Sequence, residues 1–380
     1  MMTKVGKLID EFNGTVTEQI RSHHNPSTLE FNGWNFSTAK ITREVVEILF
    51  QTYQRHHQVV PFSRLPSLPQ EVCWKDCEIG SYQGQWLDNK RHGHGCCKYK
   101  NGERYDGEWE DGKRHGLGVQ TWPNGDVYDG VWEKDHRNGF GTFRDRDGEY
   151  RGQWDNDKKQ GWGIFAWESD KETYYEGEWD NGIMHGWGKW EQDNQERYEG
   201  EWVGGRFQGH GIFKSKDGWR YDGEWSQHER SGQGKCVWKD KSTYAGEWRN
   251  DKRHGQGTST CVKGKYEGQW EDDIWSGKGT LTTKEKEIAG YWKGEEIEPT
   301  QPVTITWSNG DVYKGGWENG QAHGEGTYTY KDGTVFEGKF WYDEDRMLGE
   351  GTMAKTSKQT IHGKWHGFPP KPNTHFHLFY

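Results

Sequence analysis

The chain has 380 residues, among them 54 Gly, 24 Trp and 18 Tyr, and it carries 50 Lys and Arg against 60 Asp and Glu. Its scarcity of aliphatic residues excludes the core of a standard α/β enzyme, and its aromatic content excludes disorder, because each Trp or Tyr can bury about 150–250 Å². The net charge of −10 is opposite in sign to that of a typical duplex-binding protein, so we expect no nucleic-acid partner.

The N-terminal residues 1–59 are predicted to form a helical cap or extension. Ser37 is a suitable N-cap for a helix that ends at Gln54. One stripe of this helix carries Ile41, Val45, Ile48, Leu49 and Thr52. Three roles are open for the stripe: it covers the first strand edge of a repeat array, it docks a partner, or it lies on a membrane surface.

Residues 60–78 are predicted to be a linker, since the segment from Val60 to Pro69 contains three Pro.

The first 20 residues lack the apolar run of a secretory signal peptide, and no stretch of the sequence is apolar for long enough to cross a membrane. The six Cys are too sparse for a disulfide scaffold. These features predict a cytosolic protein.

A motif Tyr-x-Gly-x-Trp recurs through residues 79–367, mostly at a spacing of 23 residues. The repeat-defining aromatic residues are Tyr82, Trp86, Tyr105, Trp109, Tyr128, Trp132, Tyr150, Trp154, Tyr175, Trp179, Tyr198, Trp202, Tyr221, Trp225, Tyr244, Trp248, Tyr266, Trp270, Tyr313 and Trp317. Less regular copies begin at Ile288, Phe336 and Ile361, which makes twelve full units and a terminal half-unit. Such self-similarity is typical of a repeat architecture.

A second motif, His-Gly-x-Gly, follows in many units, as at His115, His185 and His254. Alternate residues of a strand share one face, so the Tyr, Gly and Trp of the first motif point the same way, and the Gly residues leave room for aromatic rings against the backbone. Asn-Gly and Asp-Gly pairs lie between the motifs, and both residues of such a pair can take the positive φ of a tight hairpin turn. We therefore predict an all-β fold, an elongated single-layer antiparallel meander of about twelve β-hairpins with a short helical N-terminal extension.

The two motifs together resemble the MORN repeat (membrane occupation and recognition nexus), and the resemblance covers residues 82–367. It implies β-hairpins in elongated single-layer sheets and the role of a non-enzymatic scaffold. Similar MORN proteins serve in ciliary axonemes, notably the radial spoke head, or in cytoskeletal and membrane-contact assemblies. Others carry a lipid kinase or lysine methyltransferase domain beside the repeats, and the remainder of this sequence is too short for such a domain.

The pattern weakens toward the C-terminus. The unit that begins at Ile288 has Glu298-Pro-Thr-Gln-Pro302 in place of His-Gly-x-Gly, and a bend, bulge or edge break is expected there because Pro removes a ladder donor. The unit from Phe336 carries a run of bulky and acidic residues where a short turn is expected. Residues 368–380 form a Pro-rich and aromatic tail that is expected either to cap the last strand or to insert into a neighbour.

Basic residues stand just before many of the His-Gly pairs. Those that form the basic turn ridge are Lys90, Arg91, Lys113, Arg114, Lys158, Lys159, Lys252 and Arg253. In a meander they lie near one edge of the sheet at steps of about 10 Å, where they would bind an acidic protein or anionic lipid heads. The alternative is that they are solvated turn residues paired with acidic neighbours such as Glu108 and Glu247, and the net negative charge of the repeats counts against lipid.

Four Cys and two His lie within 25 residues, at Cys73, Cys77, His92, His94, Cys96 and Cys97. Adjacent Cys96 and Cys97 point to opposite faces of a strand and could hardly share one tetrahedral metal site. The repeated His residues are about 10 Å apart, which favours hydrogen bonds in turns over joint metal binding. We expect no metal, no cofactor and no catalytic residues, because a single-layer sheet has no enclosed cavity and the Gly-x-Gly pairs do not precede a helix.

The expected function is that of a non-enzymatic structural scaffold that binds other proteins along an exposed face of aromatic and Gly residues. The expected partners are proteins of a large axonemal or cytoskeletal assembly, with a homodimer as a further option, and the expected location is the cytoplasm and cytoskeleton, in a ciliary or flagellar axoneme. The alternative is a peripheral membrane adaptor that binds anionic phospholipids through the basic turn ridge.

Overall fold

The computed structural model describes residues 29–31, 34–36, 75–77, 80–169, 172–193, 195–343, 346–354 and 360–366. The chain forms two compact units, which we call unit 1 (Met1–Asn194) and unit 2 (Gln195–Tyr380). All regular elements among the described residues are β-strands, as the all-β prediction required. No helix long and apolar enough to cross a membrane occurs in this part of the chain.

Several predictions concern residues that lie outside the described ranges. They are the helix over 37–54, most of the cap 1–59 and of the linker 60–78, and the tail 368–380, and all of these stay predictions. Within 1–59 the structure describes a small antiparallel pair that the sequence analysis did not predict, β1 (Leu29–Phe31) with β2 (Trp34–Phe36). The boundary between the two units falls inside the segment 79–367.

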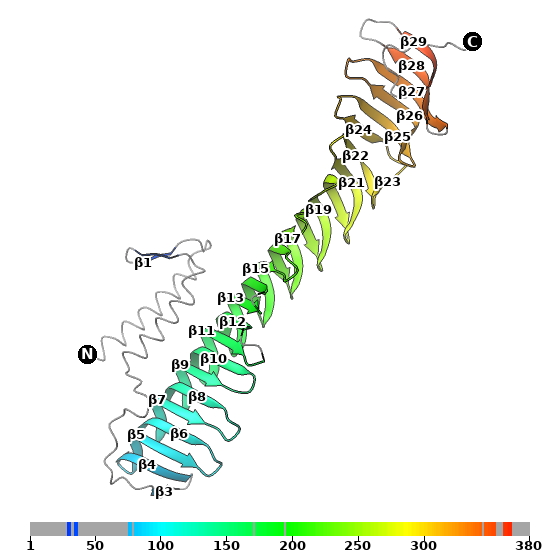
Figure 1. Cartoon of the computed structure of the whole chain (residues 1–380). Helices are drawn as coiled ribbons and strands as arrows, with labels where there is room; N and C mark the ends of the chain where they lie inside the picture. The colour runs from blue at the N-terminus through cyan, green and yellow to red at the C-terminus, as the bar shows by residue number, and fades with distance from the viewer. Residues whose placement is uncertain are drawn as a thin grey trace. The chain divides into compact units, whose positions relative to one another are not determined.

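Unit 1 continues with the strands of the first repeats. They are β3 (Lys75–Cys77), β4 (Gly80–Leu87), β5 (Lys90–Tyr99), β6 (Arg104–Glu110), β7 (Lys113–Thr121), β8 (Val127–Glu133), β9 (His136–Arg144), β10 (Gly148–Asp155), β11 (Lys158–Trp167), β12 (Tyr174–Asp180) and β13 (Ile183–Gln192). Each of these strands pairs antiparallel with the next strand of the unit, so the order in the sheet is the order in the chain (Figure 1).

Unit 2 has the same meander. Its strands are β14 (Glu196–Val203), β15 (Arg206–Lys214), β16 (Arg220–Ser226), β17 (Glu229–Val237), β18 (Thr243–Arg249), β19 (Lys252–Cys261), β20 (Gly264–Glu271), β21 (Ile274–Thr282), β22 (Lys286–Lys293), β23 (Glu296–Ile297), β24 (Val303–Trp307), β25 (Val312–Glu318), β26 (Gln321–Thr329), β27 (Val335–Asp343), β28 (Arg346–Ala354) and β29 (Thr360–His366). The sheets are open: among the described strands, β3 pairs only with β4, and β29 pairs only with β28.

Each repeat brings two Gly residues face to face, and this pair positions the Tyr. Gly223 of the first motif is the register partner of Gly234 of the second. A Cβ on Gly234 would lie 2.1 Å from the hydroxyl oxygen of Tyr221, so the Tyr ring lies directly on the Gly backbone. The Tyr221 hydroxyl donates a hydrogen bond to the carbonyl oxygen of Glu224 at 3.0 Å. The predicted packing of rings on Gly is therefore confirmed.

Within each unit, the aromatic rings of neighbouring regular repeats form an edge-to-face series. Tyr221 contacts Trp225 of its own repeat at 5.0 Å between centroids and Trp248 of the next repeat at 5.3 Å, both nearly perpendicular. Tyr244 repeats the arrangement with Trp248 and Trp270. Edge-to-face geometry is favourable for aromatic rings, and each pair contributes about 0.5–1.5 kcal/mol beyond its buried area. This series takes the place of an aliphatic core.

The carboxylate or amide in the fourth position of the first motif closes a bulge in the second. Gly232 has φ of 56°, and a register shift interrupts the pairing of β16 with β17. The amide of Gln233, which follows this Gly, donates to Oε1 of Glu224 at 2.9 Å. Glu247 accepts from the Gln256 amide in the same way. The acidic neighbours that the sequence analysis offered as partners of basic residues thus bind backbone amides.

The hairpins use two kinds of turn, and only one of them matches the prediction. At Asn181-Gly182 and Asp111-Gly112 both residues have positive φ, as expected for a two-residue hairpin turn. At Asn101-Gly102 only the Gly has positive φ, and Asn101 Oδ1 instead accepts a hydrogen bond from the Glu103 amide at 3.1 Å. The prediction of two positive φ values was wrong there, because the longer loop needs one left-handed residue and an Asn side chain that caps the turn.

The predicted break near Pro299 and Pro302 is confirmed. Strand β22 pairs first with β23 over two residues and then with β24, and both Pro residues lie between β23 and β24. The hairpin of β27 and β28 also departs from the pattern, since its register runs from Val335 and Ala354 to Asp343 and Arg346 without the usual shift.

Candidate functional site

The motif Trp residues are buried, so the expectation that this aromatic face is an exposed binding surface was wrong. Those from Trp109 to Trp292 are between 2% and 7% exposed, and the Tyr row is almost completely buried. Trp86 of the first repeat is 39% exposed, and Trp317 is half-buried. The indole Nε1 of Trp248 donates to the carbonyl oxygen of Gly234 in the preceding repeat at 3.1 Å, and Trp270 does the same to Gly257. The motif aromatics therefore join one repeat to the next.

The basic turn ridge divides between the two faces of the sheet, because neighbouring residues in a strand point in opposite directions. The second residue of each basic pair covers the Trp of the following repeat. The guanidinium carbon lies 4.0 Å from the Trp109 ring centroid for Arg91, 4.1 Å from that of Trp132 for Arg114, and 4.4 Å from that of Trp270 for Arg253. Arg137 and Arg230 occupy the same position above Trp154 and Trp248.

Arg114, Arg137, Arg230 and Arg253 also bind an Asp in the turn of the following hairpin, in an arrangement that we call the Arg–Asp clamp. Oδ1 of Asp273 accepts hydrogen bonds from the backbone amide of Arg253 at 3.0 Å and from its Nε at 2.8 Å, and the Asp273 carbonyl oxygen accepts one from Nη2 at 3.0 Å. Arg114, Arg137 and Arg230 bind Asp135, Asp157 and Asp251 in the same way.

The Arg–Asp clamp changes the titration of Asp157. Burial would raise the pKa of this carboxyl, but the hydrogen bonds donated by Arg137 and His136 outweigh it and lower the pKa from its ordinary value. At repeats without the Arg, other side chains take its place. Lys159 lies over Tyr150, Phe165 and Trp179, where burial lowers its pKa. The Phe207 ring instead stacks on Tyr198, with centroids 3.7 Å apart.

Asp273→Ala is expected to destabilise the joint between its repeats by about 1 kcal/mol more than Asp272→Ala, because hydrogen bonds to charged groups are worth about 1.5–3 kcal/mol before allowance for exposure. Both Asp residues have positive φ, so both substitutions carry the same backbone cost. Asp272 lies 3.6 Å from Arg249 and takes no part in the clamp. The measurement is native-state hydrogen exchange of β19–β21, and equal losses in the two variants would contradict the role assigned to the clamp.

The first residue of each basic pair is exposed: Lys90, Lys113, Lys158 and Lys252. Lys90 lies 3.4 Å from Asp111, and Lys158 donates to Oδ1 of Asn181 at 2.9 Å. The predicted ridge therefore retains these lysines on the surface, while Arg91, Arg114, Lys159 and Arg253 are committed to packing. Among the repeated His residues, Nδ1 of His115 lies 3.3 Å from Glu110. Nδ1 of His115 and Nδ1 of His254 are both buried without a hydrogen bond to the part of the chain that the structure describes.

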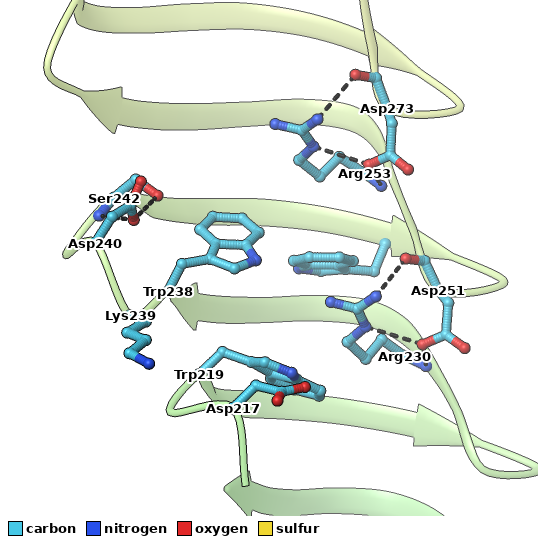
Figure 2. Close-up of a pocket in the computed structure, with 11 residues that line it drawn as sticks. Asp217, Trp219, Arg230, Trp238, Lys239, Asp240, Ser242, Asp251, Arg253 and Asp273 are labelled. Atoms are coloured by element: carbon cyan, nitrogen blue, oxygen red, sulfur yellow. Dashed lines mark hydrogen bonds and ion pairs between the residues drawn. The ribbon is translucent and has the colours of Figure 1, made fainter. Parts of the chain in front are cut away.

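The candidate site is a shallow groove of about 750 Å³ in unit 2, which we call the Trp219–Trp238 groove (Figure 2). It is lined by Asp217, Trp219, Arg230, Trp238, Lys239, Asp240, Ser242, Trp248, Asp251, Arg253 and Asp273. Figure 2 shows Trp219 and Trp238 on one side, next to the loops before β16 and after β17, and the two clamps of Arg230 and Arg253 on the other.

Contacts with neighbouring residues fix the positions of the Trp219 and Trp238 rings. Trp219 stacks on Phe213 with centroids 5.0 Å apart, and the Arg230 guanidinium lies 5.5 Å from the Trp219 ring. The Trp238 loop is closed by its own backbone, since the Trp238 amide donates to the Ser242 carbonyl oxygen at 2.9 Å. Both indoles are half-buried, so each presents part of its surface to the groove.

The charged groups of the groove differ in their availability. Asp251 and Asp273 are bound by Arg230 and Arg253, and Asp240 accepts hydrogen bonds from the amide and hydroxyl of Ser242 at 2.9 and 2.6 Å. Lys239 and Asp217 lie exposed at the rim. A shallow groove with partly exposed indoles, an Arg pair and a mixed-charge rim is suited to a protein surface, because Trp and Arg are enriched in interface hot spots.

The sequence analysis did not find this groove. Trp219 and Trp238 lie outside the repeat-defining motif, one on each side of the hairpin of β16 and β17. Trp238 has the position that Trp122 has in unit 1, whereas Trp219 stands where Asp126 stands before β8, and a Trp at that loop position was the available signal. The sequence analysis also considered Cys73, Cys77, Cys96 and Cys97 together as a possible metal site and expected no metal there. Cys96 and Cys97 are buried in β5, burial raises the pKa of the Cys96 thiol to about 11, and no cluster of His, Cys, Asp or Glu able to hold a metal occurs among the residues that the structure describes.

A family model described as MORN repeat matches residues 82–104, 105–127, 128–149, 150–170, 175–195, 198–220, 221–243, 244–265, 266–284 and 313–335, which together make up more than half of the chain. The irregular units that begin at Ile288, Phe336 and Ile361 are outside these matches. No curated protein matches the chain.

Two solved structures share limited similarity with this chain. The TCP domain of SAS-4 from Drosophila melanogaster, solved with a proline-rich motif of Ana2, is 12% identical over 40% of this chain and 82% of that chain, with a TM-score of 0.27. BamB from Moraxella catarrhalis is 9% identical over 82% of this chain and 97% of that chain, with a TM-score of 0.12. Both TM-scores are too low to support an inference.

Proposed function

Because this chain belongs to the MORN-repeat family, whose repeats mediate protein–protein or membrane interactions, we propose that it is a non-enzymatic structural scaffold that binds other proteins. The observation that carries this proposal is the Trp219–Trp238 groove, where two indoles remain partly exposed on a sheet that buries most of its motif Trp residues. The groove provides the aromatic and Arg surface that protein interfaces favour.

A scaffold must hold its binding surfaces at fixed spacing, and the joints between repeats supply this. Neighbouring repeats share strand pairing, the edge-to-face rings, the Trp-to-Gly hydrogen bond and the Arg–Asp clamp, as shown at Trp248 and Trp270. Since each contact links adjacent repeats, the stability of each unit approximates a sum over nearest neighbours. Each repeat advances the sheet by two strands, or about 10 Å.

We place this scaffold in a cytoskeletal assembly, and specifically in a ciliary or flagellar axoneme of the radial-spoke type. The support is the similarity of the repeats to those of axonemal MORN scaffolds, and the partner is a protein of that assembly. A location in the cytoplasm and cytoskeleton follows from the same proposal.

The test is cosedimentation of the purified full chain with an axonemal fraction at physiological salt. We expect Trp219→Ala with Trp238→Ala to weaken binding about tenfold, the effect of losing a modest hot spot. Trp122→Ala is the matched control, because Trp122 precedes the equivalent loop in unit 1 and packs on Phe143. Binding that is unchanged in the double variant, or equally reduced in the control, would contradict the role of the groove.

A membrane adaptor is the alternative, supported by the exposed lysines Lys90, Lys113, Lys158 and Lys252. Cosedimentation with vesicles that contain anionic phosphoinositides, run in parallel, separates the two functions. Vesicle binding that disappears when these four lysines become Glu, without binding to the axonemal fraction, would replace the scaffold by the adaptor. Arg114 and Arg253 are left unchanged, because their substitution would break the clamps with Asp135 and Asp273.

A further inference from the structure

The outer face of the sheet, opposite the Tyr row, differs between the two units. The residue between the two Gly of the second motif points to this face, because the second Gly, which follows it in the strand, lies under the Tyr ring, as Gly118 does under Tyr105. In unit 1, after His94, this position is apolar and holds Leu117, Phe140, Trp162 and Trp187. In unit 2 it is polar and holds His210, Gln233, Gln256, Lys278 and Glu325. One unit therefore carries an apolar row that the other lacks.

Neighbouring side chains on the intervening strands extend this row, which we call the outer stripe (Leu117, Val131, Phe140, Trp162 and Trp187). Val131 is the register partner of Leu117 and lies against Gly139. The other intervening strands carry Gln153 and Glu178, but the amides of Trp162 and Trp187 hold these two polar groups at 2.8 and 3.1 Å.

The outer stripe has a surface that a partner can cover. Trp187 is 37% exposed, and Ile183 on the same strand is 51% exposed. Leu117, Val131 and Trp162 are each partly exposed. Apolar side chains at the same position of four successive repeats, rimmed by polar residues, mark an interaction site rather than the scattered apolar residues of an ordinary surface.

The segment of this chain that best fits the outer stripe is the helix expected from the sequence over residues 38–54. The stripe crosses six strand spacings from β7 to β13, or about 29 Å, and a helix of this length is about 25 Å long. Its apolar side carries Ile41, Val45, Ile48 and Leu49, and its two basic and two acidic residues balance, which suits a protein surface better than an anionic membrane.

The segment that connects residues 38–54 to the sheet is long enough for the helix to reach the outer stripe. Twenty residues separate Gln54 from β3, and they can span about 66 Å when extended, whereas β3 to β7 is four strand spacings, or about 19 Å. We propose that residues 38–54 form a helix that packs Ile41, Val45, Ile48 and Leu49 on the outer stripe of unit 1.

This proposal is independent of the function proposed above. The helix covers the outer face of unit 1, and it leaves free both the first strand edge and the Trp219–Trp238 groove. The sequence analysis left three roles open for the helix: it covers the first strand edge, docks a partner or lies on a membrane. The apolar Trp162 and Trp187 of unit 1, which have polar counterparts in unit 2, favour a fourth role, packing on the outer stripe.

The test is hydrogen exchange of the full chain, followed on peptides that cover residues 38–54. In the wild-type protein we expect the amides of this segment to exchange at least tenfold more slowly than unstructured amides. Trp162→Glu with Trp187→Glu is expected to abolish this protection. His210→Glu with Gln233→Glu places the same charges at the same motif positions in unit 2, and it is expected to leave the protection unchanged.

Two further readouts keep the result unambiguous. Protection of β11 and β13 in the Glu variant shows that the hairpins remain folded, and Leu49→Asp must also abolish protection of the segment. Unprotected amides in the wild-type protein, or protection that survives in the stripe variant, would overturn the proposal. A dimer in light scattering that dissociates in the stripe variant, while residues 38–54 exchange freely, would assign the stripe to a second copy instead.

Discussion

Trp270→Ala is expected to lower the local free energy of unfolding of unit 2 by about 3–5 kcal/mol, the usual cost of removing a buried Trp. The ring is 4% exposed, and it contacts Tyr244 and Tyr266 edge-on at 5.2 and 5.3 Å. The substitution also removes the hydrogen bond to Gly257 and the ring under Arg253. Because these contacts lie on both sides of the ring, the loss is expected to open the joint between two repeats. Native-state hydrogen exchange of β18–β21 measures it.

Trp86→Ala is the matched control, since Trp86 has the same motif position in the first repeat. This ring is 39% exposed, and β3 pairs with β4 only from Lys75 to Cys77, so no complete preceding repeat is described beside it. We expect a loss of about 2 kcal/mol or less, in line with the smaller area buried. A loss at Trp270 no larger than that at Trp86 would show that burial of the motif Trp does not hold the repeats together.

Gly223→Ala is expected to destabilise unit 2 by about 3 kcal/mol or more, at the upper end of the cost of overpacking. The new Cβ would lie 2.4 Å from the Cα of Gly234 and 2.6 Å from the carbonyl oxygen of Gln233. These are backbone atoms, so no side-chain rotation relieves the clash. The φ of Gly223 is not positive, and the cost is therefore steric rather than conformational. Urea unfolding monitored by Trp fluorescence measures the change.

Gly363→Ala is the control for this effect. Gly363 has the same motif position in β29, but no atom of the described residues lies within 4 Å of the place that a Cβ would take there. We expect this change to be close to neutral. Ala lowers the conformational entropy of the unfolded chain relative to Gly, and this offsets small costs in the folded state. Equal destabilisation at Gly223 and Gly363 would contradict the close approach of the paired Gly residues as the reason for Gly in the motif.

The repeat and its hairpins could be predicted from the sequence because they depend on local chemistry. The order Tyr, Gly, Trp sets which residues share a face, and pairs such as Asn181-Gly182 set the tight turns. The Pro residues at 299 and 302 likewise located the break after β22. These features involve residues a few positions apart, so their spacing alone carries the information.

The candidate site could not be predicted in the same way. Arg253 and Asp273 are 20 residues apart, and their clamp forms only because successive hairpins stack in register. The sequence therefore suggested a surface ridge where Arg114 and Arg253 are in fact packed on Trp132 and Trp270. The same stacking brings Trp219 and Trp238, from separate loops, to one groove.

The sequence by itself determined that this protein is a chain of antiparallel hairpins with rings packed on Gly, because period, turn residues and strand alternation are local. Only the tertiary structure decided that most of the Tyr and Trp residues of the motif are buried and that one residue of each basic pair packs on the Trp of the following repeat. It also decided that Trp219 and Trp238 stay partly exposed and line one groove. The physical reason is that exposure depends on what the preceding and following repeats place over a residue.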